Sequence, residues 1–125
     1  MRRATEQGVL LVAAAGNDGP AAAPAYPAAL EEVIAVTAVD ADGQRYPEAN
    51  LGGYIDFAAP GVRVHSPSTP DGSATGTSFA APFVTAVAAV TYNSTPLRAQ
   101  LAEGRLPLDP KGAMLAAFRI ERLGN

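Results

Sequence analysis

The run from Gly76 to Pro82 (GTSFAAP) contains the residue of this chain that is best placed to act as a nucleophile. It sets the hydroxyl of Ser78 between a glycine and a long apolar stretch. A serine hydroxyl attacks a carbonyl efficiently only when a base removes its proton and a third group orients that base. Ser78 therefore suggests acyl transfer that depends on further residues. The alternative is that Thr77 or Ser78 only caps the following helix.

A second candidate, Asn17, lies in a turn-like segment, Gly16 to Pro20 (GNDGP), directly after an apolar run. A fixed side-chain amide can donate to a carbonyl oxygen that becomes negative during acyl transfer. An amide just beyond the carboxyl end of a buried parallel strand also lies where α/β folds bind their ligands. The same residues fit an ordinary turn in which Asn17 has no chemical role.

His65 is the only histidine of the chain and therefore its only imidazole base. It ends the segment 62–65, in which alternation puts two valines on one face and Arg63 with His65 on the other. This pattern is typical of a surface strand. We therefore predict that His65 is exposed and is not a catalytic base.

Apolar runs predict the elements that must position these side chains. Residues 8–15 and 33–39 lack polar alternation, as do strands of a parallel sheet that are buried on both faces. Shorter strand candidates lie at 54–58 and 62–65. The run 79–92 has helical length and no polar face, which predicts a buried helix. Further helices are expected at about 95–103 and 111–123.

Composition limits the classes of function. A chain of 125 residues with 48% hydrophobic residues suits one small domain. The net charge of −3 excludes a strongly basic nucleic-acid surface, and the absence of cysteine excludes disulfides and thiolate metal sites. No apolar run reaches the roughly 18 residues of a membrane helix. We expect neither nucleic acid nor a membrane as a partner.

The connection between the first two predicted strands leaves them without an obvious cover. Residues 16–32 contain two glycines and three prolines and show no helical period. A parallel sheet buried on both faces needs elements packed over both. The predicted helix 79–92, apolar on every side, likewise lacks partners in this chain for its full circumference. We therefore expect the chain to be part of a larger packed unit.

Three segments in this order resemble the C-terminal half of the catalytic domain of subtilisin-like serine peptidases, the subtilase family. They are residues 12–19 (VAAAGNDG), Tyr26-Pro27 leading into 33–36, and 59–61 (APG) followed by 76–82. The resemblance covers about residues 8–103. It implies a partial subtilisin-like α/β fold, mostly parallel sheet, with a buried central helix after the serine. Residues 1–125 would form one partial domain, with a divergent tail from about 104 to 125.

The resemblance also implies roles for individual residues. Ser78 resembles the nucleophile that forms an acyl-enzyme, supported by Gly76 and Thr77, and Asn17 resembles the side-chain donor of the oxyanion hole. One wall of the main specificity pocket would be formed by Ala14, Ala15 and Gly16. An alternative of similar weight is that these small residues only pack tightly in a strand.

The acid and base of the family lie upstream of the serine, and no segment here matches either motif. The implied function is serine-type endopeptidase activity on peptides or proteins, without a required cofactor and with a secreted or extracytoplasmic location. This fragment would be inactive, or nearly so, until an N-terminal half supplies the aspartate and histidine. The alternative is a non-catalytic remnant or binding module of the same fold.

Tyr26-Pro27 resembles a family position with a cis peptide bond, and we predict cis here. Nearby oxygens can hold a weak Na⁺ or Ca²⁺ ion in the family, since such ions prefer hard oxygen ligands. The matching positions are Ala28, Leu30, Val33 and Asp56. The favoured alternative is that Asp56 is a surface charge and that no metal binds.

Overall fold

The computed structural model describes residues 1–104 and 109–123, and it confirms an α/β fold. The elements, in chain order, are α1 (Arg2–Glu6), β1 (Leu11–Ala14), β2 (Val33–Val39), β3 (Phe57–Pro60), β4 (Val64–His65), β5 (Ser73–Ala74), α2 (Thr77–Tyr92), α3 (Thr95–Ala102) and α4 (Pro110–Leu123). The prediction missed α1 and β5, which are too short to produce a periodic pattern in the sequence.

The central sheet has the order β1-β2-β3, and both strand pairs are parallel, as predicted. Leu11 pairs with Val33, and Val36 pairs with Phe57. β2 has the predicted bounds, whereas β3 begins three residues after the predicted start because residues 52–55 form a turn. Pro60 ends β3, where the lack of an N–H is tolerated because β3 is an edge strand of the described sheet.

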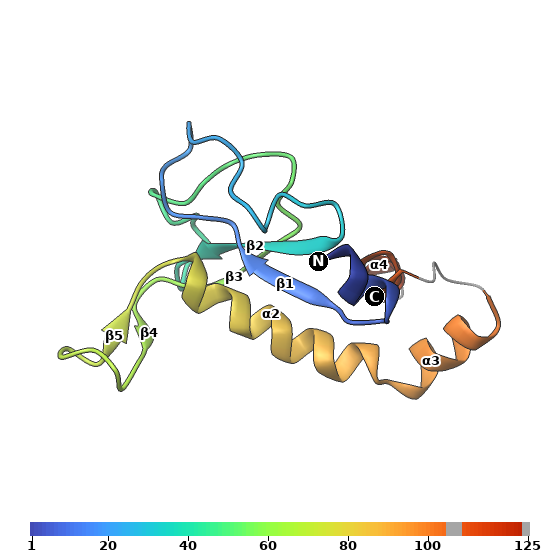
Figure 1. Cartoon of the computed structure of the whole chain (residues 1–125). Helices are drawn as coiled ribbons and strands as arrows, with labels where there is room; N and C mark the ends of the chain where they lie inside the picture. The colour runs from blue at the N-terminus through green and yellow to red at the C-terminus, as the bar shows by residue number, and fades with distance from the viewer. Residues whose placement is uncertain (105–108, 124–125) are drawn as a thin grey trace.

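One face of the sheet packs against α2, and the other lies under the two connections that enter β2 and β3 (Figure 1). Ile34, Val36 and Ala38 join Ala80, Val84 and Ala88 of α2 in the main core. The expectation that the first two strands lack a cover is wrong for β2, where residues 33–38 are all buried. The two connections that enter β2 and β3 cover the second face of β2, although their sequences show no helical period. β1 is only half-buried.

The described chain buries α2 on one side only, as expected for a helix that is apolar on every side and lacks partners here for its full circumference. Only Thr77, Ala80, Val84 and Ala88 are buried, at a spacing that puts them on one side of the helix. The other sides expose large apolar side chains, namely Phe79, Phe83, Val87 and Val90, the last with 76% of its surface accessible. The sheet supplies one packing face, and the described residues supply little along the flanks of α2.

The β4 and β5 strands and α3 lie at the two ends of α2 (Figure 1). β4 and β5 form an antiparallel hairpin beyond its N-terminal end, and α3 follows its C-terminal end (Figure 1). His65 is exposed on this hairpin, as predicted. The Tyr26–Pro27 peptide bond is cis, as predicted. Among the described residues, no helix combines the length and apolar character needed to cross a membrane.

Candidate active site

The carboxyl end of β1 and the first turn of α2 are joined by two hydrogen bonds. The N–H of Thr77 donates to Oδ1 of Asn17 at 2.9 Å. The N–H of Gly16 donates to Oγ1 of Thr77 at 3.2 Å. The fold thus brings Asn17 next to the helix turn that carries Ser78, although about sixty residues separate them along the chain.

The first turn of α2 excludes the interpretation that Thr77 or Ser78 is merely a cap. Gly76 is the N-cap, with φ at +148° and no side-chain cap bond, so Thr77 and Ser78 are the first two helical residues. Asn17 from the distant turn caps the N–H of Thr77 instead. Ser78 is exposed at this helix start, where the positive end of the helix dipole favours negative charge.

Two N–H donors near Ser78 remain available to a ligand. The Oδ1 atom of Asn17 is engaged by Thr77, and its Nδ2 lies 3.4 Å from where a β-carbon on Gly76 would stand. Within residues 1–104 and 109–123, neither this Nδ2 nor the N–H of Ser78 donates a hydrogen bond. This arrangement can stabilise an oxygen that becomes negative beside Ser78.

Asn50 and Tyr54 hold the backbone on both sides of Asn17. The completely buried Asn50 donates its N–H to the carbonyl of Gly16 at 2.9 Å and accepts the N–H of Asp18 on Oδ1 at 2.8 Å. The hydroxyl of Tyr54 donates to the carbonyl of Ala15 at 2.8 Å. Neither residue could be predicted from the sequence, because no local pattern shows that the segment around them returns to the end of β1.

Gly16 is the position of this turn that should tolerate substitution least. Its φ is +109°, and an added β-carbon would lie 2.5 Å from Nδ2 of Asn50. We expect Gly16→Ala to lower the free energy of unfolding by about 2–4 kcal/mol, through backbone strain together with this overlap. Urea unfolding followed by circular dichroism would measure the loss.

Gly19→Ala is the matched control for this prediction. Gly19 has a similar φ of +100°, but no atom lies within 4 Å of its added β-carbon. Gly19→Ala should lower the free energy of unfolding through backbone strain alone, by about 1–2 kcal/mol. Equal losses for the two variants would contradict a role for Asn50 in fixing the turn.

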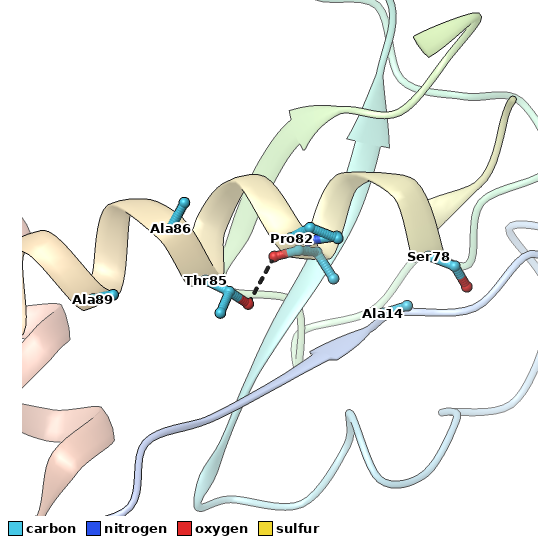
Figure 2. A pocket seen from close by; sticks show the side chains of 7 residues that line it. Ala14, Ser78, Pro82, Thr85, Ala86 and Ala89 are labelled. Atoms are coloured by element: carbon cyan, nitrogen blue, oxygen red, sulfur yellow. Dashed lines mark hydrogen bonds between the residues drawn. The ribbon is translucent and has the colours of Figure 1, made fainter. Parts of the chain in front are cut away.

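An open cleft of about 570 Å³ runs from Ser78 along one flank of α2 (Figure 2). Ser78 and Ala14 lie at one end of this cleft and Ala89 at the other. The residues that line it are Ala14, Ser78, Ala81, Pro82, Thr85, Ala86 and Ala89. None of these has a side chain that ionises near neutral pH, so this lining supplies no general base.

The three residues predicted to form a pocket wall have different environments. Ala14 is half-buried and lines the cleft beside Ser78. Ala15 is completely buried, so its side chain is not on an accessible surface. Gly16 is half-buried at the start of the turn that carries Asn17.

The predicted cation ligands lie away from the cleft, at the starts of β2 and β3. The carbonyl of Val33 and Oδ2 of Asp56 both contact the ammonium group of Lys111. The carbonyl of Leu30 accepts the N–H of Val33, and Ala28 is buried. The interpretation of Asp56 as a mere surface charge is wrong, because its carboxylate is only 17% exposed and also accepts the N–H of Ala35.

Comparisons with known proteins show which proteins this chain is similar to. A thermostable alkaline protease of Halalkalibacterium halodurans is 44% identical over 77% of this chain, and subtilisin BL of Lederbergia lenta is 41% identical over 74%. The chain spans 27% and 35% of the lengths of these two relatives. The solved structure of the prenylagaramide maturation protease PagA matches 87% of this chain and 39% of its own, with 36% identity and a TM-score of 0.63. The profile of the subtilase family matches residues 1–103, and the chain therefore belongs to the subtilase family.

Proposed function

We propose that this chain carries the nucleophile and the oxyanion donors of a serine endopeptidase. The observation that supports this most directly is the bond from the Thr77 N–H to Oδ1 of Asn17, because it leaves Nδ2 available beside Ser78. The Ser78 hydroxyl would attack the scissile carbonyl of a peptide. Nδ2 of Asn17 and the N–H of Ser78 would then stabilise the oxyanion of the tetrahedral intermediate.

Collapse of that intermediate expels the amine of the leaving peptide and leaves the acyl group on Ser78. Water then attacks the acyl-enzyme through a second tetrahedral intermediate that uses the same two donors. Ala14, which lines the cleft beside Ser78, would contribute to the wall that receives a substrate side chain.

The base that activates Ser78 must come from outside the residues that line the cleft. We propose that another part of the domain, the N-terminal half, packs along α2 and β1 and supplies the histidine and aspartate. Supporting this, β1 pairs only with β2 within the described sheet, and Phe83 and Val87 on α2 are 44% and 49% exposed. Such apolar surface on a helix flank is typical of an interface.

Peptides or proteins are the proposed substrates, consistent with the protease names of the relatives in the comparisons. We also propose a secreted or extracytoplasmic location. No cofactor is proposed, because acyl transfer requires only a nucleophile, a base and oxyanion donors.

A fluorophosphonate probe tests the proposal, because it reports an activated serine by forming a covalent phosphonate ester with loss of fluoride. We expect very weak labelling of this chain alone. Strong labelling should appear after mixing with a polypeptide that carries the aspartate and histidine segments of a subtilase, and Ser78→Ala should abolish it.

Two outcomes would contradict the proposal. Strong Ser78-dependent labelling of this chain alone would show that activation is already complete. Absence of labelling in every mixture would favour the alternative, a non-catalytic remnant or binding module that keeps the scaffold. Gel filtration of the mixture shows whether the two polypeptides associate. Association without labelling is the second outcome, whereas separate elution means that the two parts did not associate.

A further inference from the structure

The side chain of Lys111 reaches from α4 into the junction between β2 and β3. Its Nζ donates to the carbonyl of Val33 at 2.5 Å and lies 3.0 Å from Oδ2 of Asp56. The same Oδ2 accepts the N–H of Ala35 at 2.8 Å. Lys111 and Asp56 are only 15% and 17% exposed, so water screens this ion pair weakly.

The start of α4 is built to hold this side chain in place. The carboxylate of Asp109 accepts the N–H of Gly112 at 2.6 Å, and Pro110 follows it as the first helical residue, where its missing N–H has no consequence. Pro110, Ala113 and Met114 are fully buried, and Met114 belongs to the main core. These contacts fix the direction in which Lys111 projects.

The position of Lys111 in the helix is unfavourable by itself. A cation in the first turn of a helix is opposed by the helix dipole, and this turn has no acidic residue. The contacts with Asp56 and Val33 offset that cost. A solvated lysine without a role would be better placed elsewhere on α4.

The site does not fit a resident metal ion. Of the four positions that resemble cation ligands, Val33 and Asp56 already contact the ammonium group. A calcium ion would need oxygens at about 2.3–2.6 Å, which is the space that Nζ takes. Within residues 1–104 and 109–123, no group of three or more His, Cys, Asp or Glu side chains could hold a metal.

We propose that the ammonium group of Lys111 is a built-in cation that takes the place of a metal ion between β2 and β3. The divergent tail of the chain thereby replaces a soluble ion with a tethered one. Folding would then be independent of Na⁺ and Ca²⁺, and docking of α4 would be coupled to the starts of both strands. The role of Lys111 does not depend on the proposed activity of Ser78.

The test compares thermal unfolding in choline chloride, NaCl and CaCl₂ at one ionic strength, using the full chain. The wild-type midpoint is expected to be the same in the three salts. K111A should lower the midpoint by about 5–10 °C in choline chloride, because it leaves the carboxylate of Asp56 without its partner. K111A also frees the carbonyl of Val33 and the carboxylate of Asp56, two oxygen ligands in a cleft of about 360 Å³, so the vacated position should attract cations.

CaCl₂ or NaCl should therefore restore much of the K111A midpoint in a saturable manner. K111M is the matched control, because its side chain fills the space of the lysine stem without a charge and leaves no room for an ion. It should lose a similar amount and recover nothing. Adding D56N to K111A should likewise remove the recovery.

Terbium luminescence gives a direct measurement of the site. Tyr54 lines the same cleft and can sensitise a bound Tb³⁺ ion, which resembles Ca²⁺ in its ligands. Saturable luminescence is expected for K111A and not for the wild type or K111A/D56N.

Several results would overturn the proposal. These are Asp56-dependent stabilisation of the wild type by Ca²⁺ or Na⁺, an unchanged midpoint in K111A, and a loss in K111A that no cation restores. If K111A is unfolded in choline chloride, folding on addition of CaCl₂ supports the proposal, and failure to fold in every salt overturns it.

Discussion

Replacement of Ser78 by alanine is expected to lower kcat of the assembled enzyme by about 10⁶-fold, a magnitude taken from the same substitution in subtilisin itself. Ser78 supplies the only atom that can form the acyl-enzyme in the proposed mechanism, so the residual rate should come from substrate binding and oxyanion stabilisation alone. KM should change little, because the hydroxyl contributes little to binding the ground state. Initial rates with a chromogenic peptide would measure both constants.

The stability of the Ser78→Ala variant separates chemistry from folding. Ser78 is exposed, and its hydroxyl makes no hydrogen bond within the described residues. The midpoint of thermal unfolding should therefore remain within about 1–2 °C of the wild-type value, which is the range for surface substitutions. Ser68→Ala in the hairpin loop is the control for activity, because it removes an exposed serine hydroxyl that bonds only to Ser66 among the described residues, and it should keep full activity. Retention of more than a few per cent of activity by Ser78→Ala would show that another residue is the nucleophile.

Local sequence patterns were sufficient to predict the bounds and burial of an element whose packing is complete within this chain. The run 33–39 was predicted as a strand buried on both faces, and β2 occupies these residues with 33–38 buried. Its β-branched residues and lack of polar alternation reflect an environment that this chain supplies by itself. The approximate bounds of α2 and α4 were predicted too, as 79–92 and 111–123, because helical length shows in the sequence even where a flank of the helix is uncovered.

Patterns failed where the environment depends on contacts between distant segments. The apolar circumference of α2 indicated that the helix needs partners on every side, but the sequence cannot show which segment covers each flank. Asn50 and Lys111 gave no signal either, since their roles arise from bonds to Gly16 and Val33, which are 34 and 78 positions away. Such contacts are a property of the folded chain.

The candidate site, too, could be predicted only in part from the sequence. Ser78 and Asn17 could be singled out because each stands at the end of an apolar element, where functional groups of α/β folds gather. Their meeting could be expected only from the resemblance to a family. The structure adds the reason for the orientation of Asn17, namely that the N–H of Thr77 holds its oxygen, and its nitrogen lies without a partner among the described residues, beside Gly76.

That orientation gives a prediction that distinguishes donation by Asn17 from its structural role. Asn17→Asp keeps an oxygen that accepts the Thr77 N–H, and its charge near the start of α2 adds about 0.3–1 kcal/mol of stability. It also removes the N–H donor and places a negative charge beside the developing oxyanion. We expect kcat of the assembled enzyme to fall by at least about 10²–10³-fold, the range that subtilisin itself shows for loss of this donor.

Asn17→Ala removes both functions and provides the comparison. Thr77 is completely buried, so loss of the acceptor for its N–H should lower the free energy of unfolding by about 1–2 kcal/mol. Its kcat should also fall by about 10²–10³-fold. Urea unfolding of each variant, set beside its kcat, therefore separates the two roles: both variants lose activity, and only alanine loses stability. If Asn17 acted only by joining β1 to α2, Asn17→Asp would retain near wild-type kcat, because the bond that performs this joining is preserved.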